Sequence, residues 1–328
     1  EYRPLTNRGV YAKAMIKKGC IAPLIAWFRD GGEEGRLSTL DVLRDISFYD
    51  SDGGEIAKCG GIPLLIALLR DGGNEDKIKA ADTLKHISLN ANVALLVAKE
   101  GVFPPLIALL RGKMKKEKTT AVDFLKCFVS NEDNNIEICR HGCIVPLVAM
   151  LQDKDVDIKL LAAEVLEKLA HYDQSKVEIA RAGGIAHLIS MLNEKVTKTR
   201  EIVASVLHYL AENKANAVEI ARKGAITPLI ALMRDGEKVS KNTAARALSM
   251  LADIEERSVE IVRKGCVAPL IQLLNDLDED CQSNAAVLLR KLARNTENAT
   301  VIKNSEAICA LISLLQRGSD SSKSYAAN

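Results

Sequence analysis

Two cysteines and a histidine lie within five residues of one another, at Cys139, His141 and Cys143. Thiolates and imidazoles are the ligands that zinc prefers, and a structural zinc site takes four of them at characteristic spacing. The sequence shows no second pair of ligands that would complete such a set. We therefore interpret these three residues as packing side chains, and we predict neither a metal nor any other cofactor.

The remaining chemistry-bearing residues do not have the spacing of a catalytic site. No glycine-rich phosphate-binding motif occurs, and no Ser-His-Asp or Cys-His set is suggested by spacing. The 45 basic and 43 acidic residues nearly balance, and no basic stripe carries interleaved aromatic side chains. This pattern argues against nucleic-acid binding. We predict a protein with no enzymatic activity of its own, whose partners are other proteins.

Membrane insertion is not expected, because no stretch approaches the roughly 18 consecutive apolar residues of a membrane span. The segment from Glu1 to Pro4 does not resemble a signal peptide. Cys20, Cys143 and Cys266 recur 123 residues apart, so they are expected to lie far from one another as free thiols. Free thiols fit a reducing compartment, and we expect a cytoplasmic location, with the nucleus as a further one.

The elements that position these side chains come from a pattern that recurs every 41 residues without insertion. Each repeat has a start position, usually Ile or Val two residues later, often Pro at four, Leu at five and Ile or Val at six. The repeat starts are Gly19, Gly60, Gly101, Gly142, Gly183, Gly224, Gly265 and Glu306. Such regular self-similarity predicts an array of stacked helical repeats.

Within each repeat the pattern predicts three helices. The first ends at the glycine, which permits a left-handed backbone, and a proline in the first turn begins the second. The third carries an apolar stripe at helical spacing, such as Ala80, Ala81, Leu84 and Ile87. The buried face of the first helix is predicted at Ile56, Val97, Ile138, Ile179, Ile220, Ile261 and Ile302.

The domain prediction is one array over residues 1–328, about eight periods of 41 residues. Leu5 corresponds to Ile46, and Ala326 and Ala327 correspond to Ala80 and Ala81. The chain is thus predicted to start and to stop inside third helices. Natural arrays usually end in atypical capping repeats, so we expect a fragment of a longer protein.

The unit Gly-x-Ile-x-Pro-Leu-Ile-x-Leu-Leu, followed by Ala-Ala-x-x-Leu-x-x-Leu, resembles the armadillo repeat over essentially the whole chain. The resemblance implies an all-α, right-handed superhelical solenoid with three helices per repeat. It also implies a concave groove, lined by the third helices, that binds extended peptide segments of partner proteins. Importin-type repeats carry a Trp and an Asn four residues apart on the third helix, and none of seven repeats here does so. Recognition of nuclear localisation signals is therefore not expected.

The period places four rows of side chains opposite the apolar stripe, where they should face the groove. The first row is Asp41, Asp82, Asp123, Glu164, Ser205, Arg246 and Val287. The second is Arg44, Lys85, Lys126, Glu167, His208, Ser249 and Arg290. The third is Asp45, His86, Cys127, Lys168, Tyr209, Met250 and Lys291. The fourth is Phe48, Leu89, Ser130, His171, Glu212, Asp253 and Arg294.

Two interpretations of these rows stay open. In one interpretation, the acidic and basic rows of the first three repeats form a charge-patterned groove with apolar pockets at Phe48 and Leu89; in the other, each pair is satisfied on its own helix. A second group either anchors a partner or packs between adjacent third helices; it consists of His171, His208, Tyr209 and Met250. The basic run 112–118 and the acidic run 275–280 are predicted as solvated loops, with an edge contact or self-association as the alternative.

The sequence therefore predicts a protein–protein interaction scaffold that binds extended or helical segments of partner proteins. One alternative is the substrate-recognition module of a larger enzyme, because plant ubiquitin ligases with armadillo arrays have that arrangement. A second alternative is an architectural solenoid that associates with itself.

Overall fold

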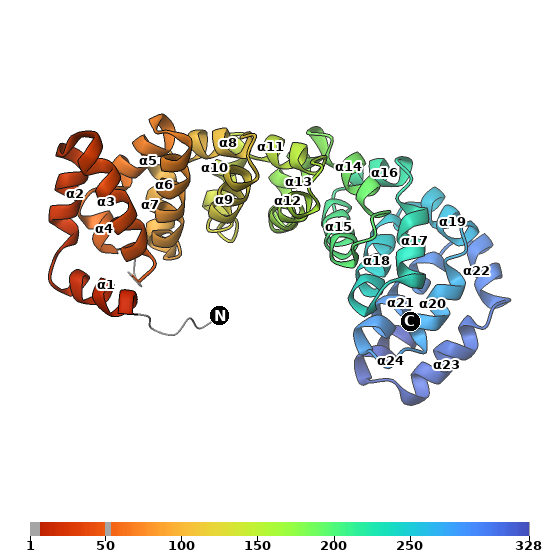
Figure 1. The fold of residues 1–328 in the computed structure, drawn as a ribbon. Coiled ribbons are helices and arrows are strands. Elements are labelled where there is room, and N and C mark those ends of the chain that lie inside the picture. The colour runs from red at the N-terminus through yellow and green to blue at the C-terminus, as the bar shows by residue number, and fades with distance from the viewer. Residues whose placement is uncertain (1–6, 50–53, 328) are drawn as a thin grey trace. The chain divides into compact units, whose positions relative to one another are not determined.

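The computed structural model describes residues 7–49 and 54–327, and in these ranges it contains helices and no β-strand. The helices follow one another in sets of three, as the 41-residue period predicts (Figure 1). The first helices of the sets are α1 (Asn7–Lys17), α4 (Gly54–Lys58), α7 (Ala91–Lys99), α10 (Glu132–Arg140), α13 (Asp173–Arg181), α16 (Lys214–Arg222), α19 (Glu255–Arg263) and α22 (Thr296–Lys303).

The second and third helices are the main packing elements of each repeat. The second helices are α2 (Ile21–Asp30), α5 (Gly61–Asp71), α8 (Phe103–Leu110), α11 (Ile144–Met150), α14 (Gly184–Met191), α17 (Ile226–Asp235), α20 (Val267–Leu274) and α23 (Ala307–Arg317). The third helices are α3 (Gly32–Ser47), α6 (Asn74–Ile87), α9 (Lys115–Leu125), α12 (Val156–Leu169), α15 (Thr197–Leu210), α18 (Lys238–Leu251), α21 (Glu279–Leu292) and α24 (Asp320–Ala327).

The chain forms two compact units, Glu1–Met150 and Leu151–Asn328. In unit 1, α3 packs on α6 and α6 on α9, while the second helices α2, α5 and α8 pack on the third helices α3, α6 and α9, respectively. Figure 1 shows α5 and α8 along one edge of this unit and α6 and α9 along the other. Unit 2 repeats the arrangement, with α12, α15, α18, α21 and α24 stacked in order and α17, α20 and α23 stacked beside them. The third helices of each unit therefore form one continuous layer.

The turn between the first and second helices is made by glycine in a left-handed conformation. All seven repeat glycines have positive φ, from 74° at Gly142 to 88° at Gly224. At Gly183 a side chain would meet no atom within 4 Å, so backbone strain and not space selects glycine there. This confirms the predicted end of the first helix.

The start of the first helix has a signal of its own. Asn90, Asn131, Asn213 and Asn295 recur in the 41-residue register, and each accepts hydrogen bonds from backbone N–H groups of the helix that it precedes. Such capping satisfies donors that have no partner inside the helix. The third helix of one repeat is thereby separated cleanly from the first helix of the next.

The core is the set of aliphatic positions that the period predicts. The first-helix residues from Ile56 to Ile302 named above are all buried. The fifth residue after the repeat start is fully buried in six repeats: Leu65, Leu106, Leu147, Leu188, Leu229 and Leu270. Leu24 and Leu311, in the two outer repeats, are half-buried. Burial of a leucine side chain contributes about 2 kcal/mol, so this column is a main source of cohesion.

Three details differ from the sequence-based expectation. The polar run Arg70–Asn74 predicts a loop between the second and third helices. In the structure this loop is only two glycines long, because α5 continues to Asp71 and α6 begins at Asn74. The basic run 112–118 enters α9 at Lys115, and the acidic run 275–280 enters α21 at Glu279. Carboxylates in a first turn favour the helix, because they interact with its positive end.

The chain-end predictions have different outcomes. Leu5 lies outside the described residues. Ala326 and Ala327 lie in α24, a third helix, as predicted. Among the described residues, no single helix is long and apolar enough to cross a membrane; α7 and α8 meet that criterion only as a pair, which is bent by 91°.

A substitution in the leucine column tests the packing. Leu147 is fully buried on α11, whereas Val145 on the same helix is 54% exposed. We expect Leu147→Ala to lower the free energy of unfolding by about 2–5 kcal/mol, because it leaves a cavity. Val145→Ala should change it by less than about 0.5 kcal/mol. Urea denaturation followed by circular dichroism measures both, and equal effects of the two substitutions would contradict this packing.

Candidate functional site

The first three predicted rows lie on the third helices or at their C-terminal ends, and the fourth lies beyond them. Helix α6 ends at Ile87, two residues before Leu89, and α21 ends at Leu292, two residues before Arg294. The expectation that the fourth row is helical is therefore wrong, and its side chains lie on the turn to the next repeat. We call the four rows together the third-helix face.

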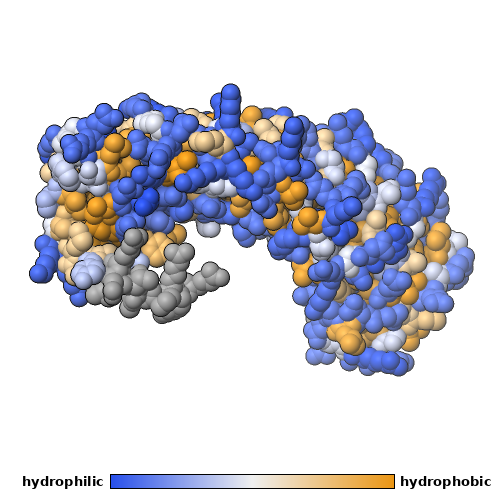
Figure 2. Space-filling view, viewed as in Figure 1, coloured by the Kyte–Doolittle hydropathy of each residue, from blue (hydrophilic) through white to orange (hydrophobic). Residues whose placement is uncertain are grey.

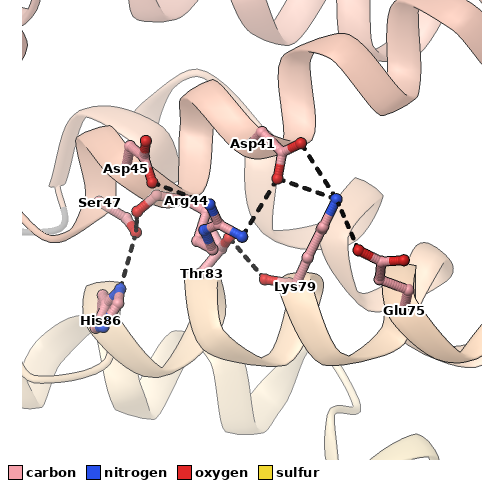
Figure 3. Close-up of polar contacts among 8 residues, drawn as sticks. All are labelled: Asp41, Arg44, Asp45, Ser47, Glu75, Lys79, Thr83 and His86. Carbon is pink, nitrogen blue, oxygen red and sulfur yellow. Dashed lines mark hydrogen bonds and ion pairs between the residues drawn. The ribbon is translucent and has the colours of Figure 1, made fainter.

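In unit 1, a carboxylate of the third-helix face joins two neighbouring helices. Asp41 of α3 lies 3.3 Å from the Arg44 guanidinium on its own helix and 3.1 Å from Lys79 Nζ on α6. Lys79 also reaches Glu75, at 3.5 Å, and Arg44 reaches Asp45, at 3.1 Å (Figure 3). The hydrogen bond from Lys79 to Asp41 raises the pKa of the Lys79 ammonium. Both charges of the predicted pair are thus already engaged.

The acidic and basic side chains of the next two repeats also pair with each other. Lys85 lies 3.1 Å from Asp82 on α6, and Lys126 lies 3.4 Å from Asp123 at the end of α9. These distances confirm the interpretation in which each acidic and basic pair is satisfied on its own helix. Exposed pairs of this kind contribute at most about 0.5 kcal/mol to stability. They also leave little net charge on this part of the face.

Exposed apolar side chains follow the C-terminal ends of two third helices in unit 1. Phe48 is 55% exposed and Leu89 is 76% exposed, so the predicted apolar pockets are instead protruding side chains. The Phe48 ring meets the His86 imidazole edge to face, with centroids 5.3 Å apart. Ser47 Oγ lies 3.2 Å from His86 Nδ1. Burial, together with the nearby charge of Lys85, lowers the pKa of His86.

In unit 2, aromatic residues connect three successive repeats. The rings of His171 and Tyr209 lie 4.0 Å apart, between the end of α12 and α15. Tyr209 also contacts the ring of His208, at 5.0 Å, and the Arg246 guanidinium on α18, at 6.0 Å. One Arg246 N–H group donates to His208 Nε2 across 2.9 Å. The four residues form a connected cluster across the layer of third helices.

His208 is a packing residue within this cluster. The residue is 6% exposed, so its predicted contact with a partner is replaced by contacts to Arg246 and Tyr209. Burial lowers the pKa of His208 to about 4, and the positive charges of Arg246 and Lys291 act in the same direction against the carboxylate of Glu212. Because the neutral ring accepts at Nε2, its proton lies on Nδ1. His208 therefore orients Arg246 without neutralising it.

The remaining predicted residues of unit 2 lie on α12, α18 and α21. Lys168 is exposed, whereas Glu164, Met250, Arg290 and Lys291 are half-buried. Lys291 is the most constrained of them, because its ammonium contacts Asp253, at 2.7 Å, and the Ser249 carbonyl, at 2.9 Å. It thereby links α21 to α18.

Two lysines outside the rows organise the face and were missed in the sequence. Lys79 spans α6 to α3, as described above. Lys176 on α13 donates to Asp173, at 2.9 Å, and to Glu212, at 2.6 Å. Burial opposes its charge, but the two carboxylates outweigh burial and raise the pKa of Lys176. The only sequence signal was the acid three residues before Lys176, because its second partner belongs to another repeat.

The cysteine and histidine cluster has ordinary packing partners. His141 lies 3.5 Å from Glu137 and stacks on the ring of Phe103. Cys143 is buried, and burial raises the pKa of its thiol to about 12. In the described parts of the chain, no three His, Cys, Asp or Glu side chains form a group that could hold a metal ion.

Stacked three-helix repeats with a left-handed glycine between the first and second helices define an armadillo-repeat solenoid. The family model described as "Plant U-box protein ARM repeat region" matches residues 119–300, which is more than half of the chain. The chain therefore belongs to this family of armadillo-repeat regions. A comparison with curated proteins finds no match.

Solved structures show the same fold. An engineered protein from a structural genomics consortium aligns with a TM-score of 0.84 and 23% identity, covering 94% of this chain and 76% of its own. A designed armadillo repeat protein aligns with a TM-score of 0.66 and 19% identity, over 70% of this chain and 99% of its own. Another designed armadillo repeat protein, in complex with the peptide (KR)4, aligns with a TM-score of 0.65 and 20% identity, over 69% and 96%.

The burial of His208 predicts a pH dependence of stability. Its pKa is about 4 in the folded chain, against an ordinary value of 6.5. The unfolded chain therefore binds the proton first, and stability is lost as the pH falls below 6.5 toward 4. Between about pH 7.5 and about pH 5 this loss is about 2 kcal/mol.

Urea denaturation of the wild type and of His208→Gln at both pH values measures this contribution. Glutamine does not titrate, so the variant should lose less stability on acidification than the wild type does. Parallel losses in the two proteins would mean that His208 is not held neutral.

Proposed function

We propose that this chain is a protein-interaction module that holds segments of partner proteins along its third-helix face. The observation that carries the proposal is the continuity of that face within each unit. Side chains of successive repeats contact one another directly, as Asp41 contacts Lys79 and Tyr209 contacts both His171 and Arg246. A surface made of equivalent positions repeated along a line suits a partner segment that is itself linear.

The composition of the face supports binding to protein. Phe48 and Leu89 are exposed apolar side chains in unit 1. Tyr209 and Met250 are half-exposed in unit 2. Aromatic, Met and Arg side chains are enriched where proteins bind one another. The designed armadillo repeat protein in complex with (KR)4 supports peptide binding by this fold. Figure 2 shows hydrophilic and hydrophobic residues interspersed on the visible surface of each unit.

A second function is favoured by the family match. The matched model describes the repeat region of plant U-box proteins, and on this basis the module selects substrates for a larger ubiquitin ligase. The parent open reading frame distinguishes the two functions. A U-box in the same frame is the result expected for the ligase, and its absence leaves the adaptor.

The exposure of the thiols supports a proposal about location. Seven of the eight cysteines are buried or half-buried free thiols, and only Cys309 is exposed. Burial also raises the pKa of Cys266 to about 12, which leaves this thiol protonated and unreactive. These features support our proposal of a reducing compartment, the cytoplasm or the nucleus.

Site-specific cross-linking tests the use of the third-helix face. A photo-reactive phenylalanine analogue replaces Met250 on α18 or, as the control, Val218 on the first helix α16, which is 46% exposed. Both positions lie in unit 2. In native cell extract we expect covalent partner adducts from position 250 and not from position 218.

Adducts from position 218 alone would contradict the proposal, because the partner would then bind the first helices. If the only adducts join two copies of this chain, the self-associating solenoid is the correct function instead. Light scattering at several concentrations confirms that outcome independently.

A further inference from the structure

The two units differ in how many charged side chains of their third-helix faces have no oppositely charged partner among the described residues. In unit 1 the aspartates at 41, 82 and 123 are each within 3.4 Å of a basic group three residues later. In unit 2 the face positions on α18, α21 and the turns that follow them carry Arg246, Arg290, Lys291 and Arg294 against one carboxylate, Asp253. The excess of positive charge therefore lies on the α18 and α21 part of the face.

Asp253, the one acid among these face positions, is already paired with Lys291. Asp253 Oδ2 accepts a hydrogen bond from Lys291 Nζ at 2.7 Å. Three guanidinium groups then remain, and none of them forms an ion pair within the described residues. Arg246 contacts an imidazole and a phenol ring, Arg290 has an Nε buried without an acceptor in the described structure, and Arg294 is exposed.

The position of Arg246 is determined by neutral partners. His208 accepts one of its N–H groups, and the Tyr209 ring lies beneath it. His208 is neutral and contributes a lone pair, so it does not cancel the charge of Arg246. A guanidinium has five N–H donors in a planar fork, so most of them stay available to a carboxylate. Such bidentate pairs are the strong ones among charged hydrogen bonds.

An open polar pocket of about 260 Å³ has Arg294, one of these three arginines, in its lining. Its lining includes Asp253, Glu255, Lys291, Arg294 and Asn295. Asp253 is paired with Lys291, and Glu255 accepts a hydrogen bond from Asn295 at 3.4 Å. Arg294 is the one charged group of this lining without a described partner. Two cations and two carboxylates line the pocket. An acidic side chain that entered it would meet Arg294 as the cation of this lining that has no carboxylate partner in the described part of the chain.

We propose that the α18 and α21 part of the third-helix face binds an extended acidic segment of a partner protein, with Arg246, Arg290 and Arg294 receiving its carboxylates. The inference rests on the proposed function and specifies the chemistry of its ligand. Charge complementarity selects the occupant. A nucleic acid is the less suitable polyanion, because this part of the face has no free aromatic side chains on which bases could stack.

Model peptides test the assignment on the full chain. Extended peptides of about twelve residues span ~40 Å and cross several third helices, which pack roughly 10 Å apart. Fluorescence anisotropy would compare peptides that alternate Ser with Glu, with Gln or with Lys. We expect the Glu peptide to bind at least about tenfold more tightly than the other two. Equal binding of the Lys peptide would overturn the proposal.

The variants locate the site. The triple substitution Arg246→Gln, Arg290→Gln and Arg294→Gln should weaken binding of the Glu peptide by at least about tenfold. Because Arg294 is exposed, Arg294→Gln alone leaves the fold intact and should still weaken binding severalfold. An unchanged affinity in these variants would exclude the assigned arginines.

A matched control removes the same charge elsewhere in unit 2. Arg181, Arg222 and Arg263 end the first helices α13, α16 and α19, at equivalent repeat positions. Their replacement by Gln should change the affinity less than about twofold, as expected for a distant, screened charge. If this control loses binding as the face variant does, a general effect of net charge explains the affinity, and the site does not exist.

The remaining outcomes separate this inference from the proposed function. A thymidine oligonucleotide that displaces the Glu peptide and binds more tightly would overturn the protein ligand. If no peptide binds but position 250 still cross-links to a partner, the acidic ligand is wrong and the interaction face stands. If the Glu peptide binds through the first-helix arginines, both are wrong.

Discussion

The structure depends on an unbroken 41-residue register that lets each repeat bury its aliphatic side chains against its neighbours. Leu65 and Leu229 are fully buried, whereas the equivalent Leu24 and Leu311 in the outer repeats are half-buried. The difference shows that cohesion comes from contact between repeats. A left-handed glycine in seven repeats turns the chain at the same point each time. Equivalent third-helix residues of each unit consequently come into line.

That alignment makes side-chain identity at a few positions decide the chemistry of the face. Where the register places Asp41 and Arg44 three residues apart, they pair with each other and with Lys79. Where the register places Arg246 beside the buried, neutral His208, the guanidinium is held in position without a carboxylate partner among the described side chains. The repeat fold is the same in both units, whereas the pairing of the charged side chains differs. We propose that specificity on this scaffold arises from the cations that the repeat leaves without a carboxylate partner.

Most of the fold could be predicted from the periodicity of the sequence. Glycine and proline determine where helices end and begin, and leucine marks buried positions, so their effects are local. Gly183 ends a first helix and Leu147 is buried, as their places in the period indicate. The C-terminal end of the third helix was not predictable in this way, since no glycine or proline marks it, and Leu89 and Arg294 were wrongly expected on the helix. Contacts between repeats, such as that of Lys176 with Glu212, depend on side-chain direction in three dimensions. For the same reason, the sequence did not decide whether His208 is buried between third helices or contacts a partner.

The most direct measurement is a methyl NMR titration of the full chain, labelled at its six methionines, with the acidic peptide. Met250 lies on α18 within the proposed site, Met114 is 43% exposed before α9, and Met233 is buried in α17. We expect the Met250 methyl resonance to shift progressively while those of Met114 and Met233 stay in place. A shift at Met114 with Met250 unmoved would contradict it, because the peptide would then bind away from the open arginines.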